Sequence, residues 1–284
     1  MDYHFAEDIK AIREMLGMTQ AGLAAEIGMQ QVTLSRSEIG RTKPSDRLLE
    51  YVYGFAYEKN IRLGRLKEML CCESIKPGHR LLFYGAKDLL EGENVFDRIG
   101  AGNAIAHAFC AVEKYDQAAS AVAGFKKSSV IYLDFDEQNL KCKRYTLTRD
   151  WILTFAYYRG ALEKYENHPT IRKLITESQS GDYIIAPIAD NRMLQIINSF
   201  ITGEITDVQC KHCLAAMNRG NQYVFTSEQA AKRLRILERS YISVNEREYY
   251  KRLRNEETRL SDDKVKLARI QYRGKGRYID EILK

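Results

Sequence analysis

Only four prolines interrupt this chain of 284 residues, and no apolar run approaches the roughly 20 residues that a membrane-spanning helix needs. The longest apolar run, residues 104–112, is interrupted by His107. The first residues are acidic and lack the basic and apolar regions of a secretory signal peptide. We therefore expect a cytoplasmic protein without a membrane partner.

The six cysteines are not spaced as a disulfide framework or a complete metal site would require. Cys210 and Cys213 are three residues apart, as in half of a zinc site, but the adjacent pair Cys71 and Cys72 cannot supply the other half. Leu214 makes the helix around Cys210 look amphipathic, with both thiols on its inner edge. The sequence therefore predicts free thiols and no metal. The remaining cysteines are Cys110 and Cys142.

Glycine-rich phosphate loops and catalytic histidine clusters are also lacking. Gly100 and Gly102 lack the third glycine of a dinucleotide fingerprint, and no Walker loop occurs. His79, His107 and His168 have no evident sequence partner, and we interpret each as a surface or core histidine.

The chain has the composition of a soluble globular protein and a basic C-terminal segment. Hydrophobic residues make up 45% of the sequence, charged residues 29%, and the formal net charge is +6. Residues 246–277 hold eleven Lys or Arg against six Asp or Glu. The basic pentapeptide 273–277 contains two glycines, which predicts a flexible segment that could touch phosphates or be a solvated tail.

Residues 13–44 read as two short helices joined by a tight turn. Thr19 is placed to cap the first helix, and Gly28 can end it in the left-handed conformation. The second helix would follow at once, which is helix-turn-helix geometry. The apolar residues that would face the core are Leu23, Ala24, Ile27, Met29 and Leu34.

The exposed face of the second helix carries side chains suited to reading a DNA groove. Gln30 and Gln31 could bind adenine edges, Thr33 a thymine methyl, and Arg36 guanine or phosphate. Phosphate contacts are expected from the flanking residues Arg13, Gln20, Arg41 and Lys43. The alternative is a helical bundle that merely packs, with both glutamines in solvent.

This spacing resembles the phage-repressor (Xre/Cro-type) helix-turn-helix family over residues 5–58. The resemblance implies double-stranded DNA as a partner and a homodimer that reads two half-sites. The positions that carry it are Gly17, Thr19, Gln20, Leu23, Ala24, Gly28, Ser35, Arg36, Glu38, Gly40, Lys43 and Pro44.

After Pro77 the pattern changes to strands mixed with helices. Strands are expected at residues 80–85, 130–135, 183–187, 222–225 and 234–242, and helices at 149–165, 191–201 and 206–217. No regular βαβ alternation appears, which favours an α+β fold. We expect a helix-turn-helix domain at 1–75, an α+β domain at 79–242 and a basic helical segment at 243–284.

Residues 81–225 resemble a bacterial domain-of-unknown-function family grouped with ADP-ribosyltransferases and often found beside repressor-type modules. The matching stretches lie at 81–87, 150–160, 182–193 and 220–225. The resemblance implies a split, mixed sheet with a cleft that holds NAD in active relatives.

The chain departs from that family where the chemistry would occur. Tyr84 replaces the histidine that binds the NAD ribose in relatives, but its hydroxyl could still donate one hydrogen bond to NAD. The segment 99–104 offers no aromatic ring at Asn103 or Ala104 to stack on nicotinamide. Gln222 is retained and would bind a ribose hydroxyl. An unheld nicotinamide loses the orientation that transfer requires. Another aromatic residue could take the vacant place: Phe96, Phe109 or Tyr115.

Three functions follow. The first is a sequence-specific DNA-binding regulator whose degenerate transferase-like domain serves sensing or protein interaction. The second is an active NAD-dependent ADP-ribosyltransferase, a toxin or phage-defence effector, fused to its own DNA-binding module. The third is an interaction protein, such as the antitoxin-like partner of a related enzyme in a toxin–antitoxin or defence operon. Fold resemblance cannot choose among them, because function resides in sites.

Overall fold

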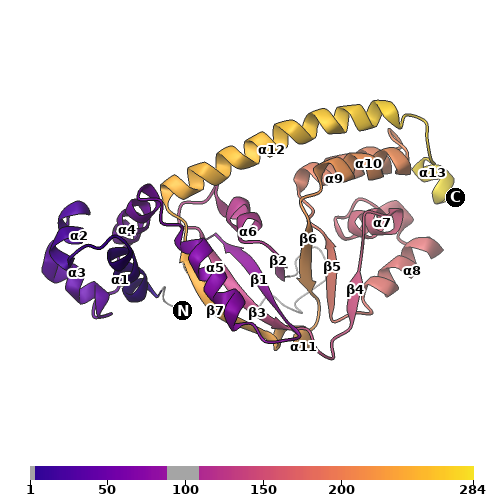
Figure 1. Ribbon diagram of the computed structural model, residues 1–284. Helices are drawn as coiled ribbons and strands as arrows, with labels where there is room; N and C mark the ends of the chain where they lie inside the picture. The colour runs from indigo at the N-terminus through magenta and orange to yellow at the C-terminus, as the bar shows by residue number, and fades with distance from the viewer. Residues whose placement is uncertain (1–3, 88–108) are drawn as a thin grey trace. The chain divides into compact units, whose positions relative to one another are not determined.

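The computed structural model describes residues 4–87 and 109–284 (Figure 1). The chain forms two compact units. Unit 1 comprises Met1–Asn94, Glu113–Asp136 and Arg235–Leu253, and unit 2 comprises Val95–Val112, Glu137–Leu234 and Arg254–Lys284. Both units therefore draw on distant parts of the sequence. The expected domains at 1–75, 79–242 and 243–284 stay a prediction.

Unit 1 begins with five helices. They are α1 (Phe5–Met15), α2 (Gln20–Glu26), α3 (Gln31–Glu38), α4 (Asp46–Glu58) and α5 (Leu63–Ser74). Thr19 and Ser45 cap α2 and α4 by accepting backbone N–H groups. Gly28 has a φ of +66° and turns the chain between α2 and α3. Phe5, Ile9 and Leu34 are fully buried in the core that these helices share.

Three strands and one helix complete the sheet region of unit 1. They are β1 (His79–Ala86), β3 (Ser129–Asp136), β7 (Leu234–Tyr241) and α6 (Tyr115–Val122). β1 pairs antiparallel with β3, which lies between β1 and β7. Gly85 lets α6 approach β1, because a Cβ there would meet the Ala118 carbonyl oxygen at 2.6 Å.

Unit 2 contains four strands in the order β4-β5-β6-β2. β4 pairs parallel with β5, whereas β5 with β6 and β6 with β2 are antiparallel. The mixture of directions agrees with the expected mixed helix-and-sheet class. The bounds are β2 (Phe109–Val112), β4 (Cys142–Arg144), β5 (Tyr183–Pro187) and β6 (Asn221–Phe225).

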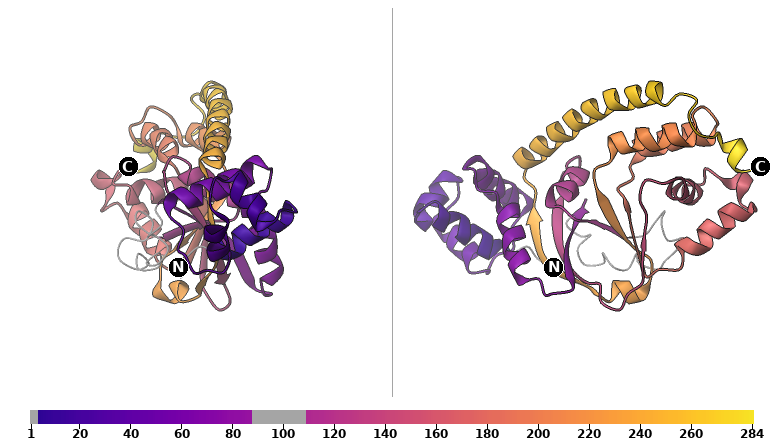
Figure 2. Two further views of the ribbon diagram at one scale, coloured as in Figure 1. Left: turned by 90° about the vertical axis from the view of Figure 1, so that its left-hand side faces the viewer. Right: turned by 45° about the vertical axis from the view of Figure 1, so that its right-hand side comes forward.

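Helices cover this sheet and share one apolar core with it. α9 and α10 lie side by side, as the views in Figures 1 and 2 agree. Ile197, Phe200 and Leu214 are completely buried between them and the strands. The bounds are α7 (Arg149–Tyr158), α8 (Pro169–Ser178), α9 (Asn191–Ile201), α10 (Asp207–Met217) and α11 (Glu228–Ala231).

The C-terminal region is a long helix followed by a docked turn. α12 (Val244–Gln271) leads into residues 272–278 and α13 (Ile279–Ile282). Asp207 and Arg277 exchange backbone and side-chain hydrogen bonds at 2.9 and 2.8 Å. The expectation of a flexible basic pentapeptide is wrong, because these bonds and the burial of Ile279 hold it against α10.

The expected elements agree closely with those observed, with one clear error. The strands expected around 80–85, 130–135, 183–187, 222–225 and 234–242 are present, as are the helices at 191–201 and 206–217. The helix expected over 149–165 ends at Tyr158, because Gly160 has a φ of +74° and a 3₁₀ turn follows. In the described part of the chain, no helix is long and apolar enough to span a membrane.

Candidate nucleic-acid interface

The turn between α2 and α3 is fixed by burial on one side and by backbone bonds on the other. Leu23, Ala24 and Leu34 are buried, so the two helices share a face. The Met29 N–H donates to the Ala24 carbonyl at 2.8 Å and closes the turn. The short helices are thus held by tertiary packing, as their length requires.

Glu38, the last residue of α3, connects this helix to α1 and α2. Its carboxylate accepts from Arg13 Nε of α1 at 2.6 Å and from Gln20 Nε2 of α2 at 2.8 Å. Burial alone would raise the pKa of Glu38, but the Arg13 and Gln20 hydrogen bonds outweigh it and lower that pKa. The same pairing raises the pKa of Arg13. This charge-assisted cluster orients α2 and α3 relative to α1.

The outer face of α3 presents an open row of polar side chains. Gln30, Gln31, Thr33 and Arg36 are exposed. Their side chains have no hydrogen-bond or ion-pair partner among the residues that the structure describes. Gln30 is the N-cap residue of α3, yet its side chain makes no capping bond. These groups are therefore available to an external ligand.

Cationic residues flank this row. Arg41 and Lys43 are exposed just after α3, and the Arg41 N–H donates to the Arg36 carbonyl at 2.9 Å. All the residues of the expected interface therefore lie on one compact helical region. Their environments differ: Arg13 and Gln20 donate hydrogen bonds to Glu38, whereas the side chains of the α3 row do not.

Sequence reasoning missed Val32. Its side chain is 59% exposed, and it lies beside Arg36 on the side of α3 opposite Leu34 and Ser37. An apolar side chain in such a row can contact a thymine methyl group. Helical periodicity could have found it, because the buried Leu34 already fixes which side of α3 faces outward.

Two polar clusters, one buried and one partly buried, connect this helical region to the rest of unit 1. Lys67 of α5 donates to Asp8 at 2.7 Å and to the Arg239 carbonyl at 3.0 Å, and it lies 3.3 Å from Glu238. Burial raises the pKa of Asp8 against the opposing effect of Lys67. Removing one of these charged side chains would leave the others buried without their ion-pair partner.

The second cluster centres on Glu50 of α4. Its carboxylate accepts from the Tyr241 hydroxyl at 2.8 Å, from Arg247 at 3.2 Å and from the Val244 backbone N–H. Glu50 thereby joins α4 to the end of β7 and the first turn of α12. The orientation of the helices in unit 1 is therefore set by residues far along the chain.

The comparisons with known proteins agree with this geometry. Residues 9–50 match the helix-turn-helix family model. The chain thus carries a helix-turn-helix near its N-terminal end, which supports DNA binding. Residues 104–236 match a second model, described as a protein of unknown function (DUF3990). No curated protein and no solved structure matches the chain.

The residues expected to bind NAD fall in different units, so each is described by itself. Tyr84 of β1 is half-buried and lies opposite Ile131 in the β1–β3 register. Gln222 of β6 is half-buried, and its Nε2 donates to the Pro187 carbonyl at 3.4 Å. Phe96 and the expected nicotinamide-binding segment 99–104 lie outside the described residues. The two other candidate rings, Phe109 and Tyr115, are both buried.

A small cavity of about 10 Å³ adjoins Gln222. Trp151 and Phe155 stack on its wall at a centroid distance of 5.5 Å. A volume of this size holds about one water molecule. The other residues that line it are Tyr145, Thr154, Ile184, Ala186 and Val224.

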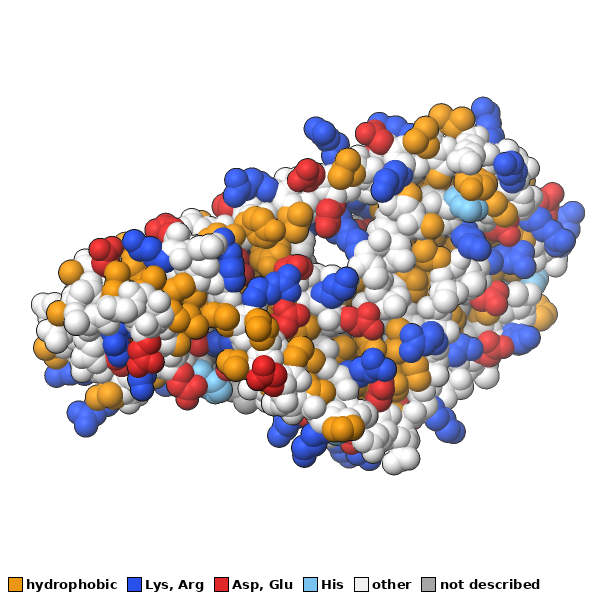
Figure 3. All heavy atoms as spheres, viewed as in Figure 1, with side chains coloured by type: hydrophobic (Ala, Val, Ile, Leu, Met, Phe, Trp, Pro, Cys, Tyr) orange, Lys and Arg blue, Asp and Glu red, His pale blue; other side chains and the backbone are white. Residues whose placement is uncertain are grey.

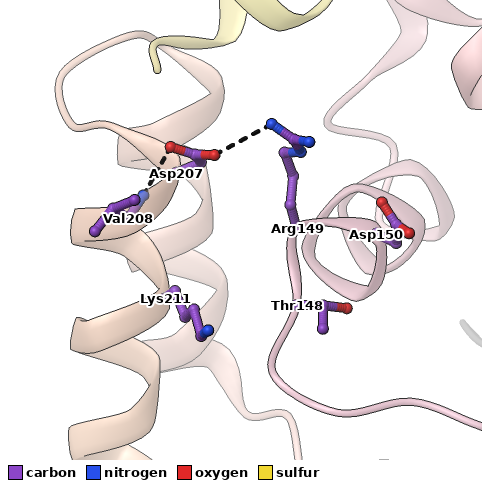
Figure 4. A pocket seen from close by; sticks show the side chains of 6 residues that line it. All are labelled: Thr148, Arg149, Asp150, Asp207, Val208 and Lys211. Carbon is purple, nitrogen blue, oxygen red and sulfur yellow. Dashed lines mark hydrogen bonds and ion pairs between the residues drawn. The ribbon is translucent and has the colours of Figure 1, made fainter. Parts of the chain in front are cut away.

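A more open groove of about 370 Å³ lies between α7 and α10 in unit 2. Figure 4 shows Arg149 reaching across it to Asp207, at 3.3 Å. Asp207 also accepts from the Val208 and Arg277 N–H groups. Arg149 and Asp207 thus pair with each other across the groove, and none of the expected site residues lies in it. Cys210 and Cys213 of α10 are buried in the core, and burial raises the pKa of both thiols.

Proposed function

We propose that this chain is a sequence-specific DNA-binding regulator whose α3 enters the major groove. The observation that carries this proposal is the unpartnered polar row on α3, together with the partly buried hydrogen-bonded cluster around Glu38. A groove reader needs both features, since base edges demand polar groups and discrimination demands that they be held in place.

The side chains divide into two roles. Gln30, Gln31, Thr33 and Arg36 read base edges, with Val32 in apolar contact, while Arg41 and Lys43 approach phosphates. The sequence predicts phosphate contacts for Arg13 and Gln20 as well. Their bonds to Glu38 instead support a positioning role in which they fix the angle between α2 and α3.

The test starts from a random duplex library, because the recognised sequence is unknown. Selection with the full chain should yield a preferred site. The double variant Gln30→Ala with Gln31→Ala should lose about 1–3 kcal/mol of discrimination per base contact while keeping most of its non-specific affinity. Gln229→Ala, an exposed glutamine in unit 2, is the matched control and should bind as the parent does.

A library without an enriched sequence, or a double variant that keeps its preference, would refute this proposal. Glu38→Gln sharpens the assignment of roles, since it preserves shape and removes the charge that holds Arg13. We expect it to weaken binding to all duplexes similarly, because it loosens α3 and changes no base contact.

We further propose that the region matching the family of unknown function has no catalytic role and serves sensing or protein interaction. Gln222 lies beside a cavity of about 10 Å³, far smaller than a nicotinamide ring needs. Tyr84 stands where the resemblance would require histidine. A transferase must hold its NAD while the ribose bond loosens, and these groups offer little to hold it.

Nicotinamide release from NAD by the purified chain tests this second proposal. We expect no release above that of heat-denatured protein, with or without DNA. Release that is abolished by Gln222→Ala and retained by Gln229→Ala would overturn the proposal. The active NAD-dependent transferase, as a toxin or defence effector, would then be the function.

A further inference from the structure

The loop between α6 and β3 places four consecutive exposed residues on the surface of unit 1. They are Gly124, Phe125, Lys126 and Lys127. Phe125 is 42% exposed, and the Lys87 ammonium group lies 5.0 Å from the centroid of its ring. The face of an aromatic ring attracts a cation in this position. Three lysine side chains are thus gathered within a short stretch of surface.

Hydrogen bonds hold this loop at both ends. The Phe125 N–H donates to the Val122 carbonyl at 3.0 Å, and the Ile242 N–H donates to the Ser128 carbonyl at 3.2 Å. Ser128 is fully buried, and its hydroxyl donates to the Phe125 carbonyl at 3.2 Å. The lysines therefore stand on a fixed backbone, which lowers the conformational entropy that is lost when they bind a partner.

The loop lies beside the helix-turn-helix, although the two are far apart in the sequence. Lys127 Nζ is 2.6 Å from the carboxylate of Asp46, the first residue of α4. Arg41 and Lys43, which are expected to approach phosphates, precede Asp46 by five and three residues. Both side chains of the Lys127–Asp46 pair are about half exposed, so the pair contributes little stability. It nevertheless places the loop next to the cations that follow α3.

The arrangement of charges, rather than their number, distinguishes this surface. Basic and acidic side chains are mixed over the face of the molecule shown in Figure 3. At the loop, Lys127 neutralises Asp46, which would otherwise repel a phosphate near Lys43. Lys126 has no hydrogen-bond or ion-pair partner among the residues that the structure describes. Its charge is therefore available to a phosphate.

We propose that the loop 124–127 forms a second part of the DNA interface and contacts phosphates of the same duplex, beside the base pairs that α3 reads. This inference rests on the proposed DNA-binding function. Duplex DNA carries one phosphate charge per about 1.7 Å of its axis, so a duplex that brings phosphates to Arg41 and Lys43 also presents others to neighbouring cations. Lys126 makes the contact, and Lys127 keeps Asp46 from opposing it.

The loop belongs to the region that matches the family of unknown function, residues 104–236. That region therefore takes a direct part in binding DNA, in addition to the sensing or interaction role proposed above. Phosphates carry no sequence information, so the loop adds affinity and fixes the orientation of unit 1 on the duplex without changing the preferred site.

The salt dependence of binding tests the phosphate contact, on the duplex site that the full chain selects from a random library. Lys126→Gln should lower the slope of log affinity against log salt by about 0.9 and leave the preferred sequence unchanged. Lys232→Gln is the matched control, since this lysine is exposed in unit 2, and it should keep the slope of the parent. Thermal melting of each variant confirms an intact fold, which the exposure of both lysines leads us to expect.

A double-mutant cycle tests the role of Lys127. Lys127→Gln alone leaves the Asp46 carboxylate without this cation and should weaken binding to every duplex. Asp46→Asn combined with Lys127→Gln should bind more tightly than Lys127→Gln alone, because no carboxylate then faces the phosphates. A double variant that binds no better than Lys127→Gln would overturn this role.

Tethered cleavage tests where the loop lies on the duplex. The exposed native thiols are first removed as Cys72→Ser and Cys142→Ser. An iron chelate attached to the thiol introduced by Lys126→Cys should then cut the DNA at a discrete position, within about one helical turn of the selected site. The same treatment of the protein that lacks Lys126→Cys measures the background cutting from the remaining thiols.

The outcomes separate this inference from the proposed function. A parent that selects no site overturns the DNA-binding function and this inference with it. A parent that selects a site, together with an unchanged salt slope for Lys126→Gln or the absence of a discrete cut, overturns the loop contact alone. In that case α3 and its flanking cations bind DNA without the region of unknown function.

Discussion

Unit 1 and unit 2 are stabilised in different ways. Among the described residues, the buried charged side chains all lie in unit 1: Asp8, Lys67, Asp134, Arg239 and Arg247. The core of unit 2 is instead a continuous apolar cluster of helices α7 to α10 with the strands beneath them. Apolar packing is non-directional, whereas a buried ion pair tolerates only one geometry.

The difference indicates where orientation matters most in this molecule. The helices that carry the candidate DNA interface are tied to β7 and α12 by Lys67 and Glu50, so their position depends on few, directional contacts. Unit 2 is instead held together by many apolar contacts, none of which requires one particular geometry. Four variants test this contrast.

The largest expected effect is that of Lys67→Met. The variant leaves Asp8 and Glu238 without their common cation in a buried site, and we expect a loss of about 3–5 kcal/mol in the free energy of unfolding. Urea denaturation measures it. Lys232→Met, which removes a lysine that is 79% exposed, should change the stability by less than about 0.5 kcal/mol. Equal losses of unfolding free energy in both variants would contradict the view that unit 1 depends on its buried charges.

Glu246→Gln tests a half-buried carboxyl group in unit 1. The Glu246 carboxyl accepts from the Tyr115 hydroxyl at 3.1 Å, and burial raises its pKa from 4.5 to about 7. Between these values the native state holds a proton that the unfolded chain has released, so the parent loses stability as pH rises from about 4.5 to 7.

The glutamine variant should lack this dependence. At pH 8 it should be more stable than the parent by an amount on the order of 3 kcal/mol, and near pH 4 the two should converge. Urea melts across this pH range measure the difference. Glu248→Gln, two residues away on the exposed side of the same helix, should keep the pH dependence of the parent. A parallel pH profile for Glu246→Gln would refute the buried-carboxyl account.

Gly276→Ala tests the docked turn of unit 2. A Cβ at Gly276 would collide with the Asp207 carboxylate and would lie 2.6 Å from Val208, so we expect a loss of about 1–3 kcal/mol and faster proteolysis of the last residues. Gly274 also has a positive φ but has no atom within 4 Å of a Cβ. Gly274→Ala therefore reports backbone strain alone. If both variants behave alike, contact with α10 does not hold the turn.

The smallest expected effect concerns the exposed cations of the same turn and depends on DNA binding. Arg273→Gln with Lys275→Gln should lower the slope of log affinity against log salt by about 0.9 for each phosphate that the variant no longer neutralises, with unchanged sequence preference. Lys232→Gln serves as the control. An unchanged slope would mean that these side chains are merely solvated.

The helix-turn-helix could be predicted from local pattern alone. Thr19 and Ser45 are capping residues, Gly28 suits the left-handed turn, and Leu23 and Leu34 follow the helical period. Each of these signals acts within a few residues, so the sequence carries it directly. The same holds for strands such as β5 and for the caps of α9 and α10.

Contacts between distant segments could not be predicted in this way. Glu38 was visible as a motif position, but its bonds to Arg13 and Gln20 depend on how three helices pack. Lys67 reads as an ordinary surface lysine until α5 places it against Asp8 and Glu238. The basic turn at 273–277 read as flexible because its partner, Asp207, lies far away in the chain.

The sequence by itself determined which segments form helices and strands, and which side of each faces the core, because propensity, capping and periodicity are local. Tertiary structure alone decided which charges are buried, and which residues near α3 are bonded and which are open. These properties depend on contacts between residues far apart in the chain, and a buried charge persists only where such a contact provides its partner.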